Sequence, residues 1–236
     1  MDKTPPNFTP DAALLKMLTN ILVSLIFIAL LVFAGAGRLN WGLGWLFVAV
    51  WGVLKLVILL QLRWRDPALL VERALRHENT QHYERLILPV YSVLSFGTIL
   101  VAGLDGGRLH WSEPVPTEVI ILAYILYLLG NVLSAWAASA NPFFSAESRH
   151  QADRDQKVAR SGPYRFVRHP AYLATILLWS VTGLLLGSWW AVVPGLLSAL
   201  MIFIRTVYED RMLHTELTGY SEYARQVRYR LIPGIW

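Results

Sequence analysis

The chain has 236 residues, of which 55% are apolar and 16% charged, and its mean hydropathy is +0.44. Charged residues make up about 25% of a typical soluble domain, so this composition predicts an integral membrane protein. The absence of cysteine excludes disulfides, thiolate metal sites and a thiol nucleophile. A formal net charge of +5 fits either nucleic acid or anionic lipid, and the positions of the charges decide between them.

Charged residues gather in three segments, which are separated by long apolar stretches. Residues 63–85, 141–170 and 205–230 hold nine charged residues each. This pattern is typical of the loops of a membrane protein, and we therefore expect membrane lipids and no nucleic acid as partners.

The apolar stretches predict an all-α membrane bundle. A hydrocarbon core of about 30 Å requires about 20 helical residues. Four stretches meet this length, at residues 18–37, 41–62, 86–104 and 119–140. The fifth, His169–Ile204, would measure about 54 Å as one helix, so it should fold as a hairpin. We predict a turn at residues 187–190 and Pro194 near the start of the second arm, which gives about six transmembrane helices.

The distribution of Lys and Arg predicts the orientation of the helices. Eighteen of these residues fall on one side of the predicted membrane, two fall on the other side, and Lys55 lies inside a span. The positive-inside rule then places both termini and the three charged segments on the cytoplasmic side. The membrane itself is expected to be either a bacterial inner membrane or the endoplasmic reticulum. Residues 34–36 resemble a signal-peptide cleavage site, but the preceding apolar run is longer than a usual signal sequence.

Several familiar functional motifs are missing from the sequence. The six histidines contain no closely spaced pair of the kind that holds metals in membrane desaturases, and we expect no metal. Gly35-Ala36-Gly37 joins two apolar helices rather than a strand and a helix, which argues against a nucleotide-binding loop. Lys55 and Arg205 as polar sites leave open a non-enzymatic membrane protein or a small transporter, although Lys55 lies close enough to a span end to snorkel to the surface.

The segment from Gln151 to Tyr172 is the first candidate site. It is polar, rich in aromatic rings, and leads through Arg168-His169-Pro170 into the fifth span. Proline suits the first position of a helix, and the free N–H groups there, together with Arg168, should attract an anion. Aromatic side chains can hold an adenine or shelter a sulfonium.

The segment from Arg205 to Pro233 is the second candidate site, and it is predicted to continue the sixth span into the cytoplasm as a helix. Arg205 and Glu209 share one face at the membrane boundary. Asp210, by contrast, is expected to point elsewhere and to face solvent, as are Arg211 and Glu222.

At these two segments the chain resembles the isoprenylcysteine carboxyl methyltransferase family and the related phospholipid methyltransferases. The resemblance covers residues 141–236, through NPFFS, SGPYRFVRHPAY, and E-D-x-x-L followed by Y-x-x-Y and R-L-I-P. Members of the family often have His at position 156, Glu at 210 and Gly at 174, where this chain has Gln156, Asp210 and Ala174. Gln156 can still form hydrogen bonds, so the cofactor is expected to be the same as in the family. Ala174 changes a helix contact near the site, so the identity of the acceptor is less certain than that of the cofactor.

The resemblance implies a multi-pass membrane enzyme that transfers a methyl group from S-adenosylmethionine to a lipophilic acceptor and releases S-adenosylhomocysteine. Residues 1–140 would then form an N-terminal membrane bundle of four spans, and residues 141–236 the methyltransferase core of the same structural domain. Arg205 would face the acceptor. The cofactor contacts would be Gln151, Gln156, Lys157, Val158, Ala159, Tyr164, His169, Pro170, Ala171, Tyr172 and Glu209.

The first hypothesis for the reaction is methylation of a carboxylate on a lipid-like or lipidated acceptor, which Arg205 would hold. A carboxylate held in line with the methyl group needs no general base. The alternatives are a phospholipid amine or a small thiol, from which a base must first remove a proton; His169 is the candidate for that base. The sequence predicts no oligomeric state.

Overall fold

The computed structural model describes residues 9–75, 81–145, 148, 151 and 154–236, and the described part of the chain is helical with no strand. This confirms the predicted fold class. In chain order, the elements are α1 (Pro10–Ala36), α2 (Gly42–Arg65), α3 (Pro67–Ala74), α4 (Glu84–Ala102), the π-helix η1 (Gly103–Leu109), α5 (Thr117–Ser139), the 3-10 helix η3 (Gly162–Arg165), α6 (Pro170–Leu185), α7 (Val192–Glu216) and α8 (Tyr220–Gln226).

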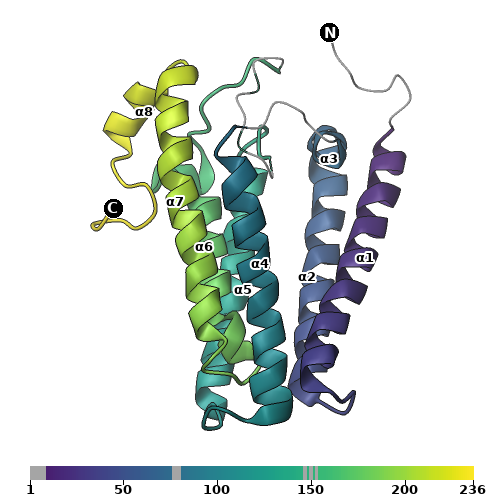
Figure 1. The fold of residues 1–236 in the computed structure, drawn as a ribbon. Coiled ribbons are helices and arrows are strands. Elements are labelled where there is room, and N and C mark those ends of the chain that lie inside the picture. Colours follow the sequence, from purple (N-terminus) through teal and green to yellow (C-terminus); the bar gives the residue numbers. More distant parts are fainter. Residues whose placement is uncertain (1–8, 76–80, 146–147, 149–150, 152–153) are drawn as a thin grey trace.

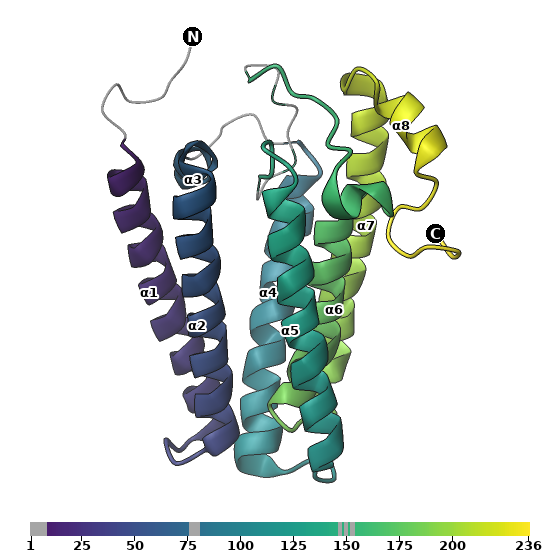
Figure 2. The same cartoon turned by 180° about the vertical axis from the view of Figure 1, so that it is seen from behind.

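Five of these helices are long and apolar enough to cross a membrane: α1, α2, α4 together with η1, α5, and α7. The sixth, α6, has 16 residues, and its length of about 24 Å is shorter than a typical hydrocarbon core. Figure 1 and Figure 2 show the long helices running side by side, with α6 between α5 and α7. Each predicted apolar stretch is therefore a separate helix or helix pair.

The predicted hairpin is confirmed, and a buried carboxylate ties its turn to the rest of the bundle. The turn between α6 and α7 contains Gly187, whose φ of +69° favours glycine, and Pro194 lies in the first turn of α7. Asp105 of η1 is fully buried and accepts hydrogen bonds from the hydroxyls of Ser188 (2.5 Å) and Ser112 (2.7 Å). The sequence analysis missed this link.

Close backbone contact joins α1 to the junction of α4 and η1. A Cβ atom added at Gly35 would lie 2.8 Å from the carbonyl oxygen of Leu100, and one added at Gly103 would lie 2.6 Å from that of Val32. Such distances are shorter than real Cβ contacts, so only glycine allows this packing.

The charged segments meet at one end of the bundle, which we call the charged end. It contains the start of α1, the short helix α3, the start of α4, and α8 beyond the end of α7 (Figure 1, Figure 2). The prediction that α7 continues as one helix to Pro233 is wrong. The helix ends at Glu216, and Gly219, with a φ of +81°, reverses the chain so that α8 packs back toward the bundle.

Candidate active site

A cavity of about 380 Å³ opens at the charged end, within the usual size range of small-molecule sites. Both predicted site segments contribute to its wall, together with α3, α4 and α5. Pro170 does not line the cavity; it is buried at the first position of α6, behind His169. The other predicted site residues all line it: Gln151, Gln156, Lys157, Val158, Ala159, Tyr164, His169, Ala171, Tyr172, Arg205 and Glu209.

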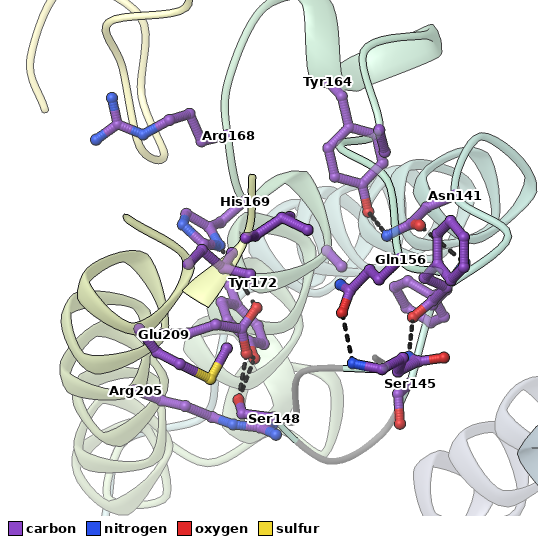
Figure 3. A pocket seen from close by; sticks show the side chains of 18 of the residues that line it. Asn141, Ser145, Ser148, Gln156, Tyr164, Arg168, His169, Tyr172, Arg205 and Glu209 are labelled. Atoms are coloured by element: carbon purple, nitrogen blue, oxygen red, sulfur yellow. Dashed lines mark hydrogen bonds and ion pairs between the residues drawn. The ribbon is translucent and has the colours of Figure 1, made fainter. Parts of the chain in front are cut away.

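The carboxylate of Glu209 is the polar centre of the cavity. The hydroxyls of Ser148 and Tyr172 both donate hydrogen bonds to it, and these two hydroxyls lie 3.3 Å apart (Figure 3). The Nδ1 atom of His169 lies 3.8 Å from Glu209. The start of α6 and the end of α7 therefore meet at one site, as the sequence predicts, although Ser148 was not among the predicted residues.

Asp210 is buried, and the expectation that it faces solvent is wrong. Its carboxylate is 1% exposed and accepts hydrogen bonds from Nε of Arg168 (2.9 Å), Nε of Arg230 (2.8 Å) and the hydroxyl of Tyr220 (2.9 Å). It also lies 3.1 Å from Nε2 of His169. Asp210 thus connects the segment before α6 to the chain beyond α8.

Arg168 does not offer the free positive charge that the sequence suggested for an anion at the start of α6. Besides pairing with Asp210, its guanidinium donates to the carbonyl oxygens of Val227 (3.2 Å) and Arg228 (3.1 Å). The backbone N–H groups of Arg168 and His169 donate to the carbonyl oxygens of Tyr229 and Arg230, each at 2.9 Å. These donors hold the C-terminal segment in place instead of a ligand.

Arg205 pairs with a carboxylate that the sequence analysis did not single out. Glu84, at the start of α4, accepts hydrogen bonds from Nε (2.7 Å) and Nη2 (3.0 Å) of Arg205, and its side chain is 2% exposed. The guanidinium also lies over the ring of Tyr172, 5.1 Å from its centroid. The sequence analysis counted Glu84 among the charges of a loop. Only its position next to α7 in the structure reveals that it is the ion-pair partner of Arg205.

The two predicted glutamines mainly shape the loop that closes the cavity. The side-chain amide of Gln151 donates to the carbonyl oxygen of Phe143 (2.7 Å), and its carbonyl oxygen accepts from Arg154 (2.7 Å). The side-chain oxygen of Gln156 accepts from the backbone N–H of Gln151 (2.7 Å). Lys157 is exposed and lies 3.5 Å from Asp155.

One wall of the cavity is aromatic and apolar. Leu217, Tyr220 and Tyr223 are buried and pack with Val158. Burial raises the pKa of Tyr220 and Tyr223, so their hydroxyls remain donors at neutral pH. The hydroxyl of Tyr223 donates to the carbonyl oxygen of Tyr164 (2.7 Å), which holds the wall together.

This wall and the Glu209 carboxylate fit S-adenosylmethionine. Aromatic and apolar side chains suit a purine, and a carboxylate at the cavity centre suits a sulfonium or a ribose hydroxyl. Across the described ranges, no group of three or more His, Asp or Glu side chains is arranged to hold a metal.

A second, apolar arm of the cavity extends between the helices. Tyr91 lies seven residues into the bundle from Glu84, and Ile202 lies seven residues before Glu209, so this arm reaches about 10 Å below the polar cluster. The wall residues between the helices come from α4, α5, α6 and α7: Leu88, Tyr91, Ser134, Thr175 and Ile202.

The comparisons with known proteins agree with this geometry. No curated protein matches the chain. A family model described as phospholipid methyltransferase matches residues 119–217, a range that runs from α5 to just past the end of α7 and contains His169, Arg205 and Glu209. Together with the apolar helices, this match supports a membrane methyltransferase.

Proposed function

We propose that the protein transfers a methyl group from S-adenosylmethionine to the amine of a lipid that enters from the bilayer. The observation that carries this proposal is a single cavity with a polar, aromatic arm at the charged end and an apolar arm between the helices. The polar arm suits a nucleoside, and the apolar arm suits a lipid chain.

The cofactor would lie against the aromatic wall, with Glu209 beside its positively charged sulfur. S-adenosylmethionine supplies an electrophilic methyl group. Ser148 and Tyr172 orient the Glu209 carboxylate by donating hydrogen bonds to it, so the negative charge is already in place before the cofactor binds. Leu217 and Tyr223 would help to exclude water from this side.

The pairing of Arg205 with Glu84 favours an amine over a carboxylate as the acceptor. A bidentate carboxylate already occupies the Nε and Nη2 positions of the guanidinium. An acceptor carboxylate would have to compete with Glu84 for Arg205, whereas an amine would leave this pair intact.

Transfer to an amine requires a proton acceptor, and His169 has suitable surroundings. With Nε2 of His169 donating to Asp210, its Nδ1 atom, 3.8 Å from Glu209, would be left to accept a proton on the side of the cavity. The amine would lose a proton to Nδ1 before its nitrogen forms a bond to the methyl carbon and the carbon–sulfur bond breaks.

Methylation of a carboxylate, as in the isoprenylcysteine carboxyl methyltransferases, is the second candidate. It is favoured by the position of Arg205, which lines the cavity and lies beside Tyr172. In this reaction the acceptor would have to displace Glu84 from Arg205.

The experiment that tests the proposal begins with binding of S-adenosylhomocysteine to the purified protein. We expect a rise in heat stability, and no shift at millimolar ligand would favour a non-enzymatic membrane protein or a transporter. Membranes are then incubated with methyl-labelled cofactor, with and without the protein, and the lipid extract is treated with alkali. A methyl ester then releases its label as volatile methanol, whereas a methylamine keeps the label on nitrogen in the non-volatile fraction, so release of labelled methanol would replace the amine with the carboxylate.

A further inference from the structure

Arg73 of α3 is a positive charge in the cavity wall that the mechanism above does not use. Its guanidinium lies over the ring of Phe144, 5.1 Å from the centroid, and both residues line the cavity. The residues on either side of it in sequence fix its position, because Ala74 is buried against α1 and α2 while Glu72 faces Nη1 of Arg154 at 3.8 Å.

Arg73 has no carboxylate partner among the described residues. Its acidic neighbour Glu72 is directed to Arg154, and every other ion pair of the described chain joins other groups. Burial lowers the pKa of Arg73 below its ordinary value, because desolvation disfavours the charged guanidinium. A partly buried guanidinium in a cavity wall is a ready site for an anion.

The position of Arg73 favours a lipid phosphate as that anion. It belongs to α3, outside the segments that form the aromatic arm, and α3 lies at the level where the headgroups of a bilayer would surround the charged end (Figure 1). The same cavity wall contains Leu88 and Tyr91, which belong to the apolar arm. A lipid with its chain in that arm would therefore have its headgroup near Arg73.

We propose that Arg73 binds the phosphate of the lipid acceptor and so selects phospholipids over neutral lipids. The proposal rests on the proposed function for the identity of the acceptor, but its binding step does not depend on methyl transfer. Arg73 acts by binding and positioning and takes no part in the transfer of the methyl group.

The binding experiment uses the full-length protein in a maltoside detergent with dihexanoyl phosphatidic acid, dihexanoylglycerol and inorganic phosphate as separate probes. We expect the phosphatidic acid to bind more tightly than either other probe. Arg73→Gln should weaken its affinity about ten- to a hundredfold, the range for loss of a charge-assisted hydrogen bond. Arg73→Lys should recover part of the affinity. Arg65→Gln, at an exposed position at the end of α2, is the matched control and should change nothing.

Three results would overturn the proposal. The first is unchanged phosphatidic acid affinity in Arg73→Gln. The second is a parallel loss of S-adenosylhomocysteine affinity, which would assign Arg73 to the carboxylate of the cofactor. The third is inorganic phosphate binding as tightly as the lipid, which would make this a site for free anions. Heat stability of each variant without ligand shows whether it is folded.

Kinetics provide the second measurement. For a phospholipid acceptor, Arg73→Gln should raise KM about ten- to a hundredfold with kcat within about threefold of the wild type, because the lost contact is the same in the ground state and the transition state. A loss confined to kcat would contradict a binding role. If the wild type transfers no methyl group to any lipid, the proposed function fails, while the binding result still decides whether Arg73 holds a phosphate.

Discussion

At the scale of single residues, two adjacent carboxylates on α7 have separate surroundings. Glu209 faces the cavity and accepts hydrogen bonds from Ser148 and Tyr172, whereas Asp210 faces the segment before α6 and the C-terminal segment. Neighbouring positions on a helix differ by about 100°, so the two side chains leave α7 in different directions. One carboxylate therefore faces the cavity, while the other joins the segment before α6 to the C-terminal segment.

Loss of the charge at Asp210 should therefore destabilise the protein. In Asp210→Asn the guanidinium groups of Arg168 and Arg230 lose their shared counter-charge, and breaking a buried pair of this kind costs about 3–5 kcal/mol. We expect a lower apparent unfolding temperature and faster proteolysis of residues 227–236. Glu222→Gln, at an exposed position of α8, is the control. Equal heat stability of the two variants would contradict the role of Asp210.

Glu209 and Arg205 should separate cofactor binding from acceptor turnover. Glu209→Ala removes the carboxylate at the cavity centre and should weaken S-adenosylhomocysteine affinity by about tenfold or more, since hydrogen bonds to charged groups contribute about 1.5–3 kcal/mol. Arg205→Ala should largely spare that affinity, and a loss of turnover in this variant would favour the second candidate, in which Arg205 holds an acceptor carboxylate. Calorimetry on both variants checks this, and equal losses of affinity would show that the two roles are not separate.

At the scale of elements, a buried ion pair adds to the packing between α4 and α7. Glu84 and Arg205 are both buried and meet through two hydrogen bonds. Each single variant, Glu84→Gln or Arg205→Met, leaves the other group without its partner. We expect the double variant to unfold at a higher temperature than either single one, because it leaves no unbalanced charge. Strictly additive shifts in unfolding temperature would rule out this coupling.

The glycine contact between α1 and α4 provides a second test at this scale. Gly103→Ala would place a methyl group 2.6 Å from the carbonyl oxygen of Val32, so the helices must separate and the apparent unfolding temperature should fall by several degrees. Gly97→Ala, in α4 just before η1, meets no atom within 4 Å and should leave stability equal or higher. A similar response of the two variants would argue against close packing at Gly103.

The elements were more predictable than their contacts. Apolar stretches of sufficient length revealed the long helices, and the length of the fifth stretch revealed the hairpin at Gly187. The sequence also indicated that His169 and Glu209 meet. It did not reveal the partners of Glu84 and Asp105, because a charged residue at a span boundary has the same local pattern whether it faces water or a buried partner. The position of Asp210 was wrong because the buried face of α7 is broader than the stripe assumed from the sequence: it includes Thr206 and Asp210 as well as Arg205.

At the scale of the whole molecule, the N-terminal half contributes to the site as well as to the membrane bundle. Glu84, Leu88 and Tyr91 come from α4, and Arg73 comes from α3. We therefore propose that residues 141–236 carry the cofactor contacts, while residues 1–140 supply part of the acceptor side. In this view the acceptor specificity depends partly on residues 1–140, most of which lie outside the family match at residues 119–217.

The orientation of the bundle can be tested directly because the chain has no cysteine. The positive-inside distribution predicts that the charged end faces the cytoplasm. A single cysteine in Glu222→Cys should react with a membrane-impermeant maleimide only after the cells are opened, whereas Arg108→Cys should react in intact cells. The reverse pattern would place the cofactor entrance outside the cytoplasm and would remove S-adenosylmethionine from consideration.

The backbone contacts of the segment before α6 have a consequence for biosynthesis. Arg168 and His169 donate to carbonyl oxygens of Tyr229 and Arg230, which leave the ribosome after every apolar helix has been made. A nascent chain arrested before these residues would have all its helices available for insertion and yet lack a fixed His169. The contacts that fix the backbone at His169 should therefore form only after residues 229 and 230 have been made, later than the apolar helices of the bundle.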